Sequence, residues 1–88
     1  MGSWADKLRR SVTVKSKKQD DCKLSVRRLC RDIGMSERIY RQVAAGENGN
    51  LHNYLRVVFR CISLHPAARQ QELLLALAAK LREEVMNE

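Results

Sequence analysis

A regular pattern of apolar residues begins at Leu24. Its first members have the i, i+3, i+4, i+7 spacing of one helix face: Val26, Leu29, Cys30 and Ile33. Ser25 precedes this run as a favourable N-cap, and Gly34 follows it as a favourable C-terminal stop. The pattern predicts a short amphipathic helix over residues 25–33.

A second short helix is predicted between Ser36, a suitable N-cap, and a stop at Gly46. Its inward side holds Tyr40, Val43 and Ala44, with Ile39 at the shoulder. Its other side is polar and holds Glu37, Arg38, Arg41 and Gln42. The Glu-Asn-Gly-Asn stretch that follows predicts a turn.

Two longer apolar segments complete the chain. One stripe of the first runs through Leu51, Tyr54, Leu55, Val58 and Ile62, while Val57 and Cys61 lie on another face. A helix that is apolar on more than one side is usually buried between neighbours. The last segment begins at Pro66, which suits the first position of a helix, and its leucines keep a helical spacing over about twenty residues.

The N-terminal part has no such stripe. Residues 4–10 can form a helical turn or two, whereas residues 11–17 alternate with period two and contain β-branched residues, which favours an extended segment. A basic flexible arm, a strand that pairs only in a dimer and a packed helix all fit this pattern.

These elements predict an all-α, compact helix-turn-helix domain of four to five helices with an extended or disordered basic N-terminal arm. The expected organisation is an arm over residues 1–21, a helix-turn-helix core over 22–62 and a C-terminal helix over 63–88 that closes the core and forms a dimer. A chain of 88 residues is at most one domain.

The charged residues are unevenly distributed along the chain. The chain has 17 Lys and Arg against 10 Asp and Glu. Residues 1–60 hold 14 basic and 6 acidic residues, a net charge of +8, and residues 61–88 hold 3 and 4, a net charge of −1. A basic front and a nearly neutral tail suggest that one part meets a polyanion and the other meets protein. A solubilising charge excess is the alternative interpretation.

Two short helices around a glycine turn are typical of a helix-turn-helix, whose second helix reads base edges in the major groove of DNA. The predicted base-reading residues are therefore Glu37, Arg38, Arg41 and Gln42, because Arg forks onto guanine, Gln onto adenine and Glu accepts from cytosine. A solvated helix face is the plainer interpretation of the same residues. The predicted phosphate contacts are Lys15, Lys17, Lys18, Ser25, Arg27, Arg28, Ser36 and Asn48.

Residues 24–46, LSVRRLCRDIGMSERIYRQVAAG, resemble the helix-turn-helix core of the phage-repressor family, which includes lambda repressor, Cro and XRE-like proteins. The resemblance rests on Leu29, Ile33, Gly34, Ser36, Tyr40, Val43 and Gly46. It implies a brace helix that begins at Ser25 and a base-reading helix over 36–45. The chain departs from the family before Leu24, where residues 10–22 do not supply the apolar positions of a first helix.

A second resemblance concerns GMSERIYRQV, residues 34–43, with Tyr54 downstream, which is similar to one helix-turn-helix of the AraC family. Both resemblances imply a DNA-binding regulator. The resulting hypothesis is a regulator of the small phage or plasmid type, which binds double-stranded DNA as a homodimer and represses or modulates transcription. The alternative is a protein-interaction module, an antirepressor or anti-activator built on a similar scaffold and bound to another regulatory protein.

The last helix holds the predicted dimerisation residues, Leu73, Leu74, Leu77, Leu81 and Val85, which serve core closure or a dimer seam. The three cysteines have no C-x-x-C spacing and are expected to be reduced thiols in a cytoplasmic protein. No phosphate loop, H-E-x-x-H or nucleophile-elbow motif occurs, so no enzymatic activity, cofactor or metal is expected. No apolar run is long enough to span a membrane.

Overall fold

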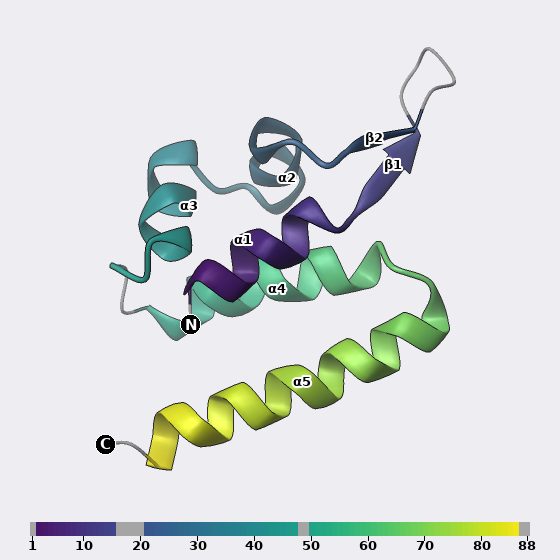
Figure 1. The fold of residues 1–88 in the computed structure, drawn as a ribbon. Coiled ribbons are helices and arrows are strands. Elements are labelled where there is room, and N and C mark those ends of the chain that lie inside the picture. The colour runs from purple at the N-terminus through teal and green to yellow at the C-terminus, as the bar shows by residue number, and fades with distance from the viewer. Residues whose placement is uncertain (1, 16–20, 48–49, 87–88) are drawn as a thin grey trace.

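The computed structural model describes residues 2–15, 21–47 and 50–86 (Figure 1). Its elements, in chain order, are α1 (Gly2–Arg10), β1 (Thr13–Lys15), β2 (Asp21–Lys23), α2 (Val26–Ile33), α3 (Glu37–Ala44), α4 (Leu51–Ser63) and α5 (Ala67–Met86). The expected all-α class with five helices is confirmed, with a small two-stranded sheet added to it.

The turn between α2 and α3 has the predicted caps. The Ser25 hydroxyl accepts a hydrogen bond from the Arg28 amide at 3.1 Å, and the Ser36 hydroxyl accepts one from the Ile39 amide at 3.2 Å. Gly34 ends α2 in the left-handed region at φ 66°, which an L-residue with a Cβ adopts at a cost. Local chemistry therefore sets the bounds of both short helices.

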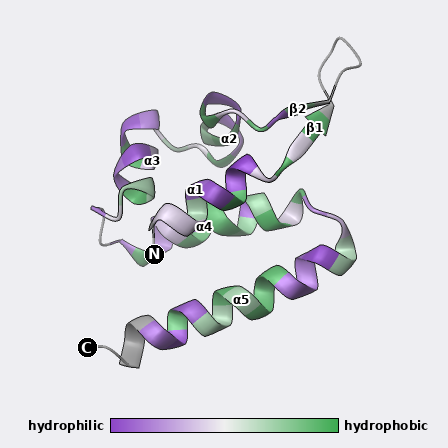
Figure 2. Cartoon of the chain, in the orientation of Figure 1, coloured by the Kyte–Doolittle hydropathy of each residue, from purple (hydrophilic) through white to green (hydrophobic). Residues whose placement is uncertain are grey.

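Helix α4 lies at the centre of the molecule and packs against the other four helices. The side chains of Val57, Val58 and Cys61 are fully buried, and Tyr54 and Ile62 nearly so. Figure 2 shows the hydrophobic colour along α4 and the middle of α5, with hydrophilic colour over much of α2 and α3. The prediction of a helix buried between neighbours is confirmed.

The N-terminal segment differs from an extended arm, because residues 2–10 form a helix that belongs to the core. Ala5 and Leu8 are buried on α1, and Val12 is buried just beyond it. Helix α1 packs against α3 and α4. The sequence pattern indicated no first helix over residues 10–22, and the structure has this helix earlier in the chain, at Gly2–Arg10. Of the three alternatives for this segment, the packed helix holds for residues 2–10.

Of the extended segment predicted over residues 11–17, Thr13–Lys15 forms strand β1 of a hairpin that was not predicted, and residues 16 and 17 lie outside the described residues. β1 pairs antiparallel with β2 in the register Thr13↔Lys23, Val14↔Cys22 and Lys15↔Asp21. Its base is fixed because Val12 and Leu24 are fully buried and the Leu24 amide donates to the Val12 carbonyl at 3.2 Å. The strands pair within the chain and project from the helices beside α2 (Figure 1).

Helix α5 packs against α4 through one side only. Leu73 and Leu77 are buried, and the Lys80 ammonium lies 5.3 Å from the centre of the Trp4 ring on α1. Leu74 and Leu75 are exposed. Among the described residues, none of the helices combines the length and the apolar character that crossing a membrane requires.

Candidate nucleic-acid interface

Helix α3 has a buried inner side and an exposed outer side. Tyr40 and Val43 are buried, whereas Glu37, Arg38 and Arg41 are exposed. The structure brings these three predicted base-reading residues to the outer side of one eight-residue helix. Gln42, the fourth, is half-buried at the edge of that side, so its amide is less accessible than the others.

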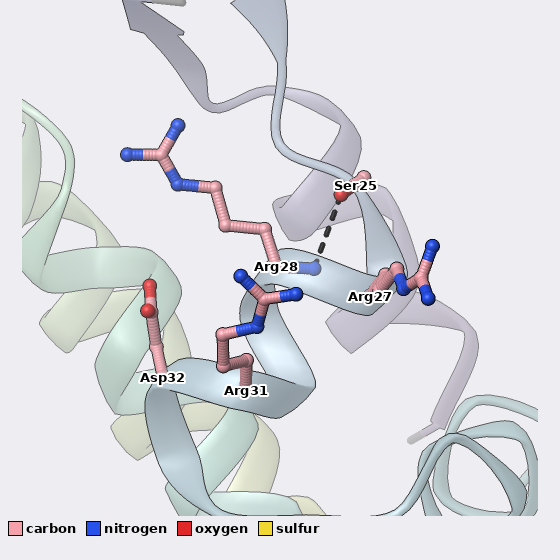
Figure 3. A pocket seen from close by; sticks show the side chains of 5 residues that line it. All are labelled: Ser25, Arg27, Arg28, Arg31 and Asp32. Atoms are coloured by element: carbon pink, nitrogen blue, oxygen red, sulfur yellow. Dashed lines mark hydrogen bonds between the residues drawn. The ribbon is translucent and has the colours of Figure 1, made fainter.

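Helix α2 carries a basic surface hollow. The hollow is lined by Ser25, Arg27, Arg28, Arg31 and Asp32 (Figure 3). The arginines follow one another within the first two turns of the helix, and all three are exposed. Since Ser25 uses its oxygen as the N-cap acceptor, its hydroxyl proton is the group that remains for an anion. In Figure 3 the side chains of Arg27 and Arg28 extend away from one another, with the Arg31 guanidinium between them, so the donors are distributed around the hollow.

The arginines of this protein fall into two groups. Those of the first group each contact an acceptor of the chain: Arg9, Arg10, Arg56, Arg60 and Arg69. Those of the second group make no hydrogen bond or ion pair through their side chains to any described residue: Arg27, Arg28, Arg31, Arg38, Arg41 and Arg82. All members of the second group except Arg82 lie on α2 and α3.

The acidic residues near this surface are partly neutralised. Asp32 pairs with Arg60 of α4 at 3.3 Å, so its charge offsets the α2 arginines less than an unpaired carboxylate would. Arg56 of α4 donates to the Ile33 carbonyl at the end of α2 and satisfies one of the last carbonyls of that helix. Two basic residues of α4 thereby fix the position of α2 without belonging to its exposed side.

A polar cluster of Asp6, Arg9 and Tyr40 joins α1 to α3. The Tyr40 hydroxyl donates to the Asp6 carboxylate at 2.5 Å and accepts from the Arg9 guanidinium at 2.9 Å. Arg9 also donates to the Leu24 carbonyl at 2.6 Å, directly before α2. The same side chain therefore positions both helices of the helix-turn-helix relative to α1.

The electrostatics of this cluster favour the charged carboxylate. Burial alone would raise the pKa of Asp6, but the hydrogen bond from Tyr40 and the guanidinium groups of Arg9 and Arg10 outweigh it, so the pKa of Asp6 lies below its ordinary value. Burial and the hydrogen bond to Asp6 raise the pKa of Tyr40, which keeps its proton. The cluster is a neutral phenol between two opposite charges.

Four of the predicted phosphate-contact residues have no described side chain. Lys17, Lys18 and Asn48 lie outside the described residues, and Lys15 is in β1 with a side chain that is not described. The serines that cap α2 and α3 are exposed.

Of the predicted dimerisation residues, Leu73 and Leu77 are buried in the core, Leu74 is exposed and Leu81 is partly buried. Val85 belongs to α5, but its side chain is not described.

The cysteines are free thiols, with Cys22 exposed and Cys30 and Cys61 buried. Burial raises the pKa of Cys61 to about 12. Among the described residues, no three His, Cys, Asp or Glu side chains come together in a way that holds a metal ion.

Sequence reasoning placed Tyr40 in the core but missed the use of its hydroxyl. A local signal exists, because Asp6, Arg9 and Arg10 have the i, i+3 and i+4 spacing of helical ion pairs. Nothing local connects that spacing to a tyrosine 31 residues beyond Arg9. Comparison of the chain with known proteins gives no match to a family model, to a curated protein or to a solved structure.

Proposed function

We propose that this protein binds double-stranded DNA in a sequence-specific manner and regulates transcription by occupying its site. Helix α3 lies in the major groove, and the basic hollow of α2 contacts the phosphate backbone. The regulator would be of the small phage or plasmid type that residues 24–46 resemble.

The observation that carries the proposal is the placement of those arginines that have no partner in the described part of the chain. Arg27, Arg28, Arg31, Arg38 and Arg41 are exposed on two consecutive helices and have no acceptor among the described residues. Arginines that only kept the protein soluble would be scattered over the surface, and many would pair with nearby carboxylates. Concentration on α2 and α3 supports a polyanionic ligand with phosphates at regular spacing.

The outer side of α3 has the chemistry of base recognition. Arg38 and Arg41 present the planar fork that matches the O6 and N7 acceptors of guanine, and Glu37 presents the acceptor that matches the cytosine amino group. The polar cluster of Asp6, Arg9 and Tyr40 supports this use, because a helix that reads bases must be held rigidly by the elements behind it.

The direct test measures binding of the full chain to random-sequence duplex DNA at two salt concentrations, followed by selection for a preferred site. A DNA-reading protein binds with a steep salt dependence, about 0.9 in log–log slope for each neutralised phosphate, and enriches one sequence. Weak binding with no enriched site would refute the proposal.

Arg41→Ala tests base reading in particular. We expect it to weaken binding to the selected site by about 1–3 kcal/mol and to relax the preference at one base pair, because a bidentate contact to that base is lost. Fluorescence anisotropy with the selected duplex and its single-base variants measures both effects.

The matched control is Arg82→Ala, which removes an exposed arginine without a described partner from α5 rather than from α3. It should leave the affinity nearly unchanged at the same salt concentration. Equal losses for the two variants would mean that only the total charge of the protein matters, and base reading by α3 would be rejected.

A protein-interaction module remains the second candidate, and the exposure of Leu74 and Leu75 on α5 favours it. In that case the protein would bind another regulator and not DNA. The two candidates separate in the DNA-selection experiment, because only the first enriches a sequence.

A further inference from the structure

The base of the β1–β2 hairpin has one buried and one exposed side. Val12 and Leu24 are fully buried, and the Leu24 amide donates to the Val12 carbonyl, which continues the strand pairing toward the helices. Successive side chains of an extended chain point to opposite sides. Thr13 and Lys23, which pair directly across the two strands, therefore lie on the side away from the core, and both are exposed.

The exposed side of the hairpin leads directly into the basic hollow of α2. Ser25, which lines the hollow, has extended backbone angles of φ −78° and ψ 155°. Lys23 belongs to β2 and Leu24 continues the pairing, so the chain stays extended from Lys23 to Ser25. Residues two positions apart in such a chain lie on the same side, with Cα atoms at most about 7 Å apart. The hollow thus continues from α2 onto the hairpin, which projects beside α2 in Figure 1.

The charge of Lys23 is not used inside the fold. Its side chain makes no hydrogen bond or ion pair to any described residue, as is also true of Arg27, Arg28 and Arg31 in the hollow. The carboxylate of the hollow, Asp32, pairs with an arginine of α4. Positive groups gathered on one side of a protein repel one another and attract a polyanion. The fourth unpaired cation therefore adds to a surface that already suits phosphates.

We infer that Lys23 donates to a phosphate of the bound DNA, and that the exposed side of the hairpin, with Thr13 beside it, is a third contact element after α3 and α2. This inference rests on the proposed function, and Lys23 is not among the phosphate contacts predicted from the sequence. A lysine contacts a phosphate as a point charge and carries no base information. Because the paired strands and the buried Leu24 hold the backbone, binding orders only the side chain of Lys23.

Three variants of the full chain test the contact. Lys23→Gln removes the charge, and Lys23→Arg keeps it at the same position. The matched control is Lys7→Gln, which removes the charge of an exposed lysine on α1 that has no partner among the described residues. Fluorescence anisotropy measures the affinity of each protein for the selected duplex and its single-base variants at several salt concentrations. Circular dichroism verifies that each variant is folded.

We expect Lys23→Gln to lower the log–log slope of affinity against salt by about 0.9, the value of one phosphate contact. The ratio of the parent's affinity to that of the variant should fall about threefold between about 50 mM and about 200 mM salt. The affinity for all single-base variants of the duplex should decrease alike, whereas Arg41→Ala acts at one base pair. Lys23→Arg and Lys7→Gln should keep the slope of the parent.

Two results would overturn this inference and leave the proposed function standing on its enriched site. One is a slope that Lys23→Gln leaves unchanged or changes no more than Lys7→Gln does. The other is a loss of preference at a single base pair in Lys23→Gln, since Lys23 would then read a base. A parent chain that enriches no site would refute the proposed function, and this inference with it.

Discussion

The hydroxyl of Tyr40 connects two charged side chains of α1 to the helix that carries the proposed base-reading residues. It donates a hydrogen bond to Asp6 and accepts one from Arg9, while the ring that carries it is buried. A phenylalanine would fill the same core space, but it would leave the partly buried carboxylate and guanidinium without their shared partner. The tyrosine therefore serves packing through its ring and orientation through its oxygen.

The lowered pKa of Asp6 gives this cluster a pH dependence. A carboxyl group whose folded pKa is lower stabilises the fold above its unfolded pKa, about 3.9, and that contribution is lost as the pH falls through the folded pKa. We expect Asp6→Asn to lower the free energy of unfolding by about 1–3 kcal/mol at pH 7. The difference between parent and variant should narrow below about pH 4. Urea denaturation at a series of pH values measures it.

Asp32→Asn is the control for that experiment, because Asp32 forms a surface ion pair with Arg60. Its loss should cost less than about 1 kcal/mol at pH 7. If the difference in free energy of unfolding between the parent and Asp6→Asn stayed constant down to low pH, the charge of Asp6 would contribute nothing to the stability of the fold.

At the scale of elements, the turn between α2 and α3 depends on one backbone conformation. Gly34 has a φ of 66°, and a Cβ there would lie 3.7 Å from the Arg56 guanidinium, which is an ordinary contact. The cost of a side chain at this position is therefore conformational rather than steric crowding by a neighbour.

Gly34→Ala should lower the free energy of unfolding by about 1–2 kcal/mol, because alanine disfavours the left-handed region. Gly34→Asn should cost less, because asparagine enters that region more readily. Thermal and urea denaturation compare the three proteins. If alanine and asparagine destabilised equally, loss of backbone freedom would not be the cause.

Local signals explain why the bounds of α2, α3, α4 and α5 were predicted closely. Serine caps, the glycine at the end of α2 and apolar spacing act within a few residues, so they are visible in the sequence. Helix α1 was missed as a core helix because it buries only Ala5 and Leu8 among its described residues, with Val12 following, and its partners lie far along the chain.

For the site, the exposure of Glu37, Arg38 and Arg41 was predicted. The half-burial of Gln42 and the hydrogen bonds from Tyr40 to α1 depend on tertiary packing and were not predicted.

At the scale of the whole molecule, the burial of two of the cysteines shows that the core between the helices is closed to solvent. Cys61 lies in α4 at the centre and is fully buried, and Cys30 of α2 is nearly so. Burial, with Glu37 nearby, raises the pKa of Cys30, and burial raises that of Cys61 to about 12. Neither thiol offers a reactive thiolate while the fold is closed.

A thiol reagent at neutral pH should therefore label one cysteine quickly and two slowly. The fast site is Cys22 on β2, because it is exposed, and the slow sites react only when the core opens. Cys22→Ser should abolish the fast phase, and urea should accelerate the slow ones. Three equal rates in the native protein would contradict the closed core described above.

The central position of α4 also bears on the order in which the chain folds during synthesis. Helix α1 is made before α3 and α4, the two helices against which it packs, and its Ala5 and Leu8 are buried in the finished fold. A nascent chain that has not yet released residues 51–63 from the ribosome cannot complete this core. Helix α1 therefore reaches its packed position only after α4 has been made, and this core closes once residues 51–63 have left the ribosome.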